Sequence, residues 1–261
     1  MIVRHLELIQ FRNYENVSID LSSHTNLLTG LNAQGKTNLL ESLVYLSLTR
    51  SHRISDEKKL IRENYDFASV SCIYEDEGTE HTMKAVIHRK GKTLFVDGHP
   101  VSKSSEFIGL LNTVLFSPDD LGIFNDSPKE RRKIVNQEIT KVSSSYLNAL
   151  NKYQSYLKQR NAVLKSDTVD ESLLDIMDEQ MSSYESVIYR ERQQFTDLIN
   201  QYISKIYQIL SDEKSEIRLH YVHCYENSNT EYICNVRKKY RKKDCLLHMT
   251  TFGTHREDFI F

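Results

Sequence analysis

Alternating hydrophobic and polar residues predict a β-sheet in the first part of the chain. The predicted strands cover residues 2–11, 17–21, 26–29, 67–75, 81–89 and 92–97. Gly-containing pairs mark the turns at Glu77-Gly78, Lys90-Gly91 and Asp97-Gly98, and the last is the strongest hairpin signal in the chain. The later strands are close in sequence and joined by tight turns, so we expect them to form an antiparallel meander.

In the second half of the chain, the alternation gives way to apolar residues spaced three or four apart. One such seam runs from Leu147 to Leu164 and another from Leu174 to Ile209, with the polar break Ser166-Asp167-Thr168 between them. Two seams joined by a short polar turn predict an antiparallel, coiled-coil-like helical hairpin. Alternation returns within residues 215–225, where we expect a strand.

The distribution of helix-breaking residues supports this division. The chain has eight glycines and three prolines among its 261 residues, and after Pro128 the only one of either is Gly253. A long stretch without either residue favours long helices and argues against a turn-rich sandwich. The sequence therefore predicts two architectures in one chain.

Charge and cysteine content narrow the class of protein. The 34 Lys and Arg residues nearly balance the 36 Asp and Glu residues, which excludes a uniformly basic coat for nucleic acid but leaves room for a local basic patch. The four cysteines form no C-x-x-C pair, so a zinc ribbon is not indicated. Without an apolar signal core or membrane-length apolar run, we expect a soluble, cytoplasmic protein with no membrane contact.

A phosphate-binding motif follows the predicted strand 26–29. Residues 30–37 read G-x-x-x-x-G-K-T and precede a helix with a broad apolar face, which is the strand–loop–helix context of a P-loop. Glycines allow backbone N–H groups to surround a phosphate, Lys36 adds a positive charge, and the Thr37 hydroxyl can bind Mg²⁺. The predicted nucleotide-binding residues are Gly30, Asn32, Ala33, Gln34, Gly35, Lys36 and Thr37.

Two polar segments each have two open interpretations. Ser51-His52-Arg53 forms either a polar loop that ends the P-loop helix or a contact to ligand. The basic run Arg237, Lys238, Lys239, Arg241, Lys242 and Lys243 surrounds Tyr240. This run is either a solvated helix face or a surface that neutralises DNA phosphates.

Several motifs together resemble one family. They are Phe11-Arg12-Asn13-Tyr14, the P-loop with Asn38-Leu39-Leu40-Glu41, Ser51-His52-Arg53, Leu115 to Leu121, Ser127 to Arg132, and Gly253-Thr254-His255-Arg256-Glu257-Asp258. In this order and spacing they resemble the RecF family of DNA replication and repair ATPases, which is related to the SMC proteins. The resemblance extends over the whole chain.

The resemblance implies an α/β fold, with an ABC-type P-loop ATPase head (a mixed sheet with an antiparallel meander) and an α-helical arm domain. The implied domains are residues 1–115 for the N-terminal lobe of the head, 116–212 for the arm and 213–261 for an incomplete return to the head. Arg12 becomes a candidate nucleotide contact, and Ser117 to Asp120 fall where SMC relatives place the Q-loop, without its Gln.

The resemblance also implies a function. RecF-like proteins bind ATP and Mg²⁺, form a homodimer with ATP, and bind single- and double-stranded DNA at replication gaps. There they act with the RecO and RecR proteins to load recombinase in recombinational DNA repair, and the family is linked to DNA damage and the SOS response. We therefore expect an ATP-dependent, DNA-binding repair and replication protein.

Some features of the family pattern are missing. Ala33 stands where Gly is common, and Thr254 replaces the usual Pro. No segment after the arm supplies an ABC signature motif or an apolar strand that ends in the acidic pair of a Walker B motif. We therefore expect a C-terminally truncated relative without hydrolytic activity of its own, and its status as an enzyme is left open. A small-molecule phosphotransferase and a non-catalytic helical association module are the alternatives.

Overall fold

The computed structural model describes residues 1–54, 56–117, 127–166, 168–211 and 215–261, and the chain divides into two compact units, Met1–Phe116 and Ser117–Phe261. Each unit has its own hydrophobic core. The predicted Q-loop position 118–120 lies outside the described residues.

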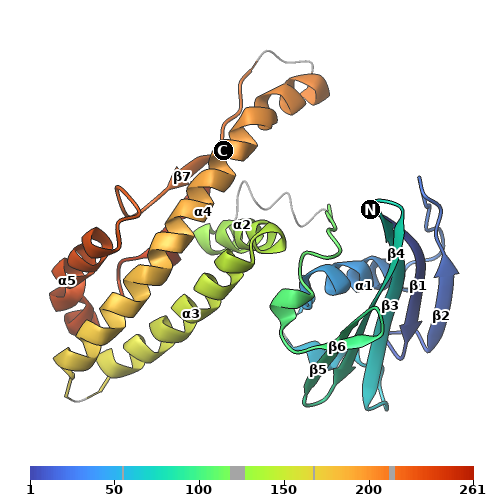
Figure 1. Ribbon diagram of the computed structural model, residues 1–261, viewed down its shortest axis with the longest axis horizontal. Helices are drawn as coiled ribbons and strands as arrows, with labels where there is room; N and C mark the ends of the chain where they lie inside the picture. The colour runs from blue at the N-terminus through green and yellow to red at the C-terminus, as the bar shows by residue number, and fades with distance from the viewer. Residues whose placement is uncertain (55, 118–126, 167, 212–214) are drawn as a thin grey trace. The chain divides into compact units, whose positions relative to one another are not determined.

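The first unit is built on a six-stranded antiparallel sheet with the strand order β2-β1-β3-β4-β5-β6 (Figure 1). The strands are β1 (Ile2–Ile9), β2 (Asn16–Asp20), β3 (Phe67–Asp76), β4 (Thr79–His88), β5 (Gly91–Val96) and β6 (His99–Val101). Helix α1 (Lys36–Leu48) packs against β3 and β4, and two short 3-10 helices cover Glu57–Leu60 and Ser104–Glu106.

The alternation seen in the sequence corresponds to the two faces of this sheet. Leu6 and Leu8 of β1 are fully buried in the core that α1 covers, whereas His5 and Glu7 project from the opposite face. The predicted turn at Asp97-Gly98 is confirmed, with φ of 48° and 77° at the two residues. Such left-handed pairs form the type I′ turns that suit the twist of a hairpin.

One predicted strand is wrong. Residues 26–29 have no strand partner among the described residues, and Leu27 is 83% exposed. A strand needs a neighbouring strand that satisfies its backbone hydrogen bonds, so an apolar run alone does not form one. A smaller difference concerns α1, where Leu40 is exposed although the sequence places it on the apolar face.

The second unit is mainly helical (Figure 1). Its elements are α2 (Pro128–Val142), α3 (Ser144–Leu164), α4 (Glu171–Ser211), β7 (His220–Val222), α5 (Thr230–Leu247), a 3-10 helix (Thr254–Arg256) and β8 (Asp258–Ile260). Helix α4 packs against both α3 and α5, and β7 pairs with β8 in a two-stranded antiparallel sheet. Residues 215–261 belong to the same compact unit as the helices, and their return to the head stays a prediction.

The predicted helical hairpin is confirmed in α3 and α4. Tyr153 on α3 and Met181 and Ile188 on α4 are almost fully buried in the shared core. Burial of each such side chain stabilises the fold by roughly 1.5–3 kcal/mol. The seam from Leu198 onward stays largely exposed because α3 has 21 residues and α4 has 41, so α3 covers only part of its partner.

Candidate functional site

The predicted P-loop adopts a strained, tightly curved backbone. Gly30, Ala33 and Gly35 have positive φ angles of 143°, 65° and 104°. The left-handed conformation costs an L-residue about 1–2 kcal/mol, and Ala33 bears that cost where glycine would avoid it. At Gly35 a Cβ atom would also lie within 2.7–2.9 Å of side-chain atoms of Asn13 and Tyr14. Gly35 is therefore required by both its conformation and its neighbours.

The loop runs directly into the N-terminus of α1. Gly35 is the N-cap residue, no side chain caps the helix, and its first turn carries no acidic residue. The first intrahelical hydrogen bond runs from the Leu39 N–H to the Gly35 carbonyl at 3.0 Å, so the N–H groups of residues 36–38 lack helical partners. Together with the helix dipole, these groups form an anion site.

A pocket of about 230 Å³ lies at this helix end and is lined by residues 32–38 and Arg53. The Lys36 ammonium donates hydrogen bonds of 2.8 Å to the carbonyls of Gly30 and Leu31, which holds its charge within the loop. The Thr37 side chain is exposed beside it. The described residues contain no cluster of three or more His, Cys, Asp or Glu side chains that would hold a metal ion by themselves.

A buried carboxylate organises the residues beneath the pocket. Glu41 of α1 is fully buried and accepts hydrogen bonds from Arg12 at 2.7 and 3.0 Å and from the Ser51 hydroxyl. Arg53 lies 3.6 Å away and also donates to the Asn38 side chain at 3.1 Å. Burial alone would raise the pKa of Glu41, but the hydrogen bonds and positive charges around it hold the pKa below its ordinary value.

These contacts show where the predicted site residues lie and bring further residues into the site. The P-loop residues come together as expected, and Arg12 forms an ion pair with Glu41, so its contact to nucleotide stays a prediction. Of the two interpretations of Ser51-His52-Arg53, the position of Arg53 in the pocket lining favours a ligand contact. Sequence reasoning assigned no role to Glu41 or Asn38, although both stand in a motif that carries the family resemblance; a further signal for Glu41 was a carboxylate on an otherwise apolar helix face.

The basic run lies on α5 and divides between two faces. Lys238, Lys239, Lys242 and Lys243 are exposed. Arg237 is only 2% exposed and donates to Asp178 at 3.2 Å and to Glu185 at 3.0 Å on α4. These contacts correct the prediction for Arg237, because a buried and ion-paired guanidinium is not available to DNA phosphates. Arg241 is mostly buried and bound by two carboxylates, so it is excluded for the same reason.

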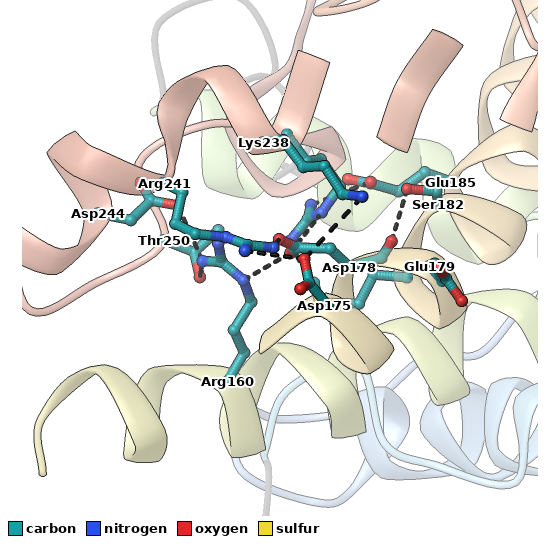
Figure 2. A network of polar contacts seen from close by, with 12 residues as sticks. Arg160, Asp175, Asp178, Glu179, Ser182, Glu185, Lys238, Arg241, Asp244 and Thr250 are labelled. Carbon is teal, nitrogen blue, oxygen red and sulfur yellow. Dashed lines mark hydrogen bonds and ion pairs between the residues drawn. The ribbon is translucent and has the colours of Figure 1, made fainter. Parts of the chain in front are cut away.

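The carboxylates that hold these arginines form a network between α3, α4 and α5 (Figure 2). Asp178 is fully buried and accepts from Arg160 at 2.8 Å and Arg241 at 2.7 Å, in addition to Arg237. Asp244 accepts from Arg160 at 2.8 Å. Burial tends to raise the pKa of Asp178, but the arginines outweigh that effect and lower it. The network joins α5 to the helical hairpin.

The segment 253–258 binds the helices of the same unit, and one of these contacts is to Glu185 of the network. The Thr254 N–H donates to Glu185 at 3.2 Å, Glu257 forms a 2.6 Å ion pair with Arg192, and Asp258 forms a 2.6 Å ion pair with Arg131. The sequence singled out this motif without a role. Within the described residues its side chains bind the helices, apart from Arg256, which is exposed.

Comparison with known proteins first identifies the class to which this P-loop protein belongs. Residues 2–183 match the family described as RecF/RecN/SMC N terminal domain. This class accounts for the α/β head with its antiparallel meander and for the helical unit that follows. Among the helices of the described residues, none combines the length and the apolar composition that a membrane span requires.

Individual relatives narrow the class. The chain is 37% identical to the DNA replication and repair protein RecF of Lachnoclostridium phytofermentans, over 100% of this chain and 73% of that protein, and 36% identical to RecF of Clostridium botulinum over 99% and 72%. A solved structure of the recombination mediator protein RecF-ATP in the RecFOR pathway superposes with a TM-score of 0.91 at 28% identity, covering 99% of this chain and 72% of that one. The chain belongs to the RecF family of DNA replication and repair proteins.

Proposed function

We propose that this protein binds ATP at the P-loop and acts as an ATP-dependent DNA-binding protein in recombinational repair and in the processing of replication gaps. The observation that carries the proposal is the loop 30–37, in which a left-handed backbone, an uncapped helix N-terminus and Lys36 converge on one pocket. Family membership and a relative's structure with ATP support the same ligand. They also favour this function over that of a small-molecule phosphotransferase.

The main polar groups in and near the pocket have separate tasks in this proposal. The N–H groups at the start of α1 would hold the phosphate oxygens, and the Lys36 ammonium would offer them a charged hydrogen-bond donor. Thr37 would hold Mg²⁺ through its hydroxyl, and the ion would neutralise negative charge on the phosphates. Arg12 and Arg53 lie at the base of the site, where their positive charge favours a polyphosphate.

The wider role follows the family. We infer that the protein acts in the cytoplasm with RecO and RecR to aid recombinase loading during the response to DNA damage, including the SOS response. It binds single- and double-stranded DNA and pairs with a second copy when ATP is present. Support for this role comes from the relatives of the chain, one of which is a recombination mediator of the RecFOR pathway.

The ATP proposal is tested by calorimetric titration of the protein with Mg-ATP. Lys36→Ala removes the only lysine that lines the pocket within the described residues, and we expect ATP affinity to fall at least about tenfold, because a charged hydrogen bond contributes roughly 1.5–3 kcal/mol. Lys90→Ala, in the exposed turn between β4 and β5, is the matched control and should bind as wild type does. Equal ATP affinities in the two variants would refute the proposed site.

The DNA proposal now rests on the exposed lysines of α5. We expect replacement of Lys239, Lys242 and Lys243 by Ala to flatten the dependence of log Kd on log salt concentration by about two to three units, because each phosphate that a lysine neutralises adds close to one unit to the slope. Fluorescence anisotropy with duplex and single-stranded DNA over a range of salt concentrations measures this slope.

A triple variant of the same unit controls for the overall change in charge. Lys133, Lys152 and Lys158 are exposed on α2 and α3, and their replacement by Ala removes the same three charges. The slope should stay as in wild type for this control. If both triple variants change the slope equally, α5 is a solvated face and not the DNA contact.

A further inference from the structure

Asn13 connects two parts of the candidate site that are far apart in sequence. It lies in the turn between β1 and β2, where its amide nitrogen donates to the Gln34 carbonyl of the P-loop at 3.1 Å. Its amide oxygen accepts from the Asn38 side chain at 2.8 Å, and Asn38 in turn accepts from Arg53 at 3.1 Å. Three side chains thus form one hydrogen-bonded chain that ends on the backbone of the loop.

The direction of donation along these hydrogen bonds is fixed at both ends of the series. A guanidinium is only a donor and a backbone carbonyl is only an acceptor. Arg53 must therefore donate to the Asn38 oxygen, which leaves the Asn38 nitrogen to donate to Asn13. Asn13 then presents its own nitrogen to Gln34, so both amides have a single consistent orientation.

These hydrogen bonds determine the orientation of one peptide group of the loop, the one between Gln34 and Gly35. In a planar trans peptide the carbonyl and the N–H point in opposite directions. When Asn13 holds the Gln34 carbonyl, the N–H of Gly35 points the opposite way within the same peptide plane, away from Asn13. The pocket is lined by residues 32–38 and Arg53 and not by Asn13, so phosphate would bind on the side to which this N–H points.

We propose that Asn13 is a positioning residue that orients the Gln34–Gly35 peptide, so that the Gly35 N–H faces the phosphate. The inference rests on the proposed ATP binding at this loop. It also accounts for the close approach at Gly35, where Asn13 occupies the space of a Cβ atom. Asn13 does not itself need to touch the nucleotide.

A merely structural role for Asn13 would have a different signature. The turn that carries it is closed by backbone hydrogen bonds from Gln10 to Glu15 at 2.8 Å and from Tyr14 to Phe11 at 2.9 Å. The backbone of Arg12 also donates to the Leu60 carbonyl at 2.7 Å. Because these bonds do not involve the Asn13 side chain, its removal should leave the fold intact and alter the loop.

The test compares nucleotide affinity with stability in single variants of the full chain. We expect Asn13→Ala to weaken the binding of Mg-ATP and Mg-ADP by about tenfold, the effect of one hydrogen bond to a charged group, with an unchanged urea midpoint. Asn13→Asp should weaken binding further, since its carboxylate faces the Gln34 carbonyl. Asn26→Ala is the matched control, because within the described part of the chain that amide bonds only to Ser22 and should leave both affinities unchanged.

A double variant tests the connection to Asn38. If Asn38 acts through Asn13, the losses of affinity in Asn13→Ala and Asn38→Ala should not add in the double variant. Wild-type affinity in Asn13→Ala, or a loss matched by an equal loss of unfolding stability, would overturn the positioning role while leaving the proposed function in place. If wild type itself fails to bind ATP, or if Lys36→Ala binds equally well, both the proposed function and this inference are overturned.

Discussion

At the scale of single residues, His255 shows how the fold selects one protonation state. Its Nε2 lies 3.1 Å from the Thr250 carbonyl, which can only accept, so that nitrogen must carry the proton. Its Nδ1 is then free to accept from the Tyr153 hydroxyl at 2.7 Å. The neutral ring is fully satisfied, and burial, with a further contribution from nearby arginines, lowers its pKa to about 4.

The low pKa of His255 predicts a loss of stability in mild acid. An unfolded histidine binds a proton near pH 6.5, so between pH 6.5 and 4 the unfolded chain takes up a proton that the folded chain does not. The free energy of unfolding should therefore fall by about 2 kcal/mol from this residue between pH 7 and pH 5. Urea unfolding at the two pH values measures the change.

Two variants isolate the contribution of His255. His255→Gln should lack this part of the pH dependence, whatever its effect on stability at pH 7. His24→Gln replaces an exposed histidine and should keep the full dependence. The interpretation fails if wild type and His255→Gln lose the same amount of stability between pH 7 and pH 5.

At the scale of elements, α5 is held to the helical hairpin by charge as well as by apolar contact. Asp178 of α4 pairs with Arg160 from α3 and Arg241 from α5 (Figure 2). It also pairs with Arg237 from α5. One buried carboxylate thus neutralises groups from two other helices. A pairing of this kind is costly to break, because the arginines left behind remain buried without a counter-charge.

Asp178→Asn should therefore destabilise the second unit by about 3–5 kcal/mol and expose α5 first. Hydrogen exchange of the α5 amides and urea unfolding report the two effects. Asp175→Asn is the matched control on the same helix; its carboxylate is 48% exposed and should cost about 1 kcal/mol or less. Equal effects of the two substitutions would mean that the buried network does not hold α5.

At the scale of the whole molecule, local features were predictable and long-range ones were not. The meander β3–β4–β5 was predicted because its alternation and its turns are contained within one stretch of sequence. Residues 26–29 were misassigned because a strand depends on a partner elsewhere in the chain. The inward orientation of Arg237 depends on acids 52 and 59 residues away, which no local pattern within the basic run reveals.

In the candidate site, too, the local features were predictable from the sequence and the long-range contacts were not. The P-loop could be recognised from its glycines and Lys36, since its chemistry is set by consecutive residues. The contacts that support the loop could not be recognised, because Asn13 reaches Gln34 across 21 residues and Arg12 reaches Glu41 across 29. Motif spacing identifies the loop that binds phosphate, whereas tertiary contacts decide which residues hold that loop in shape.

The length of α4 gives the second unit the properties of a lever. With 41 residues and a rise of about 1.5 Å each, the helix is roughly 60 Å long, so a tilt of one degree displaces its far end by about 1 Å. Charged contacts to α5 hold it between Asp175 and Glu185, while Asn200 and Ser204 hold the returning chain at Leu219 and Ile217 further along. A small rotation of α4 at either set of contacts therefore produces a larger displacement at the opposite end of the helix.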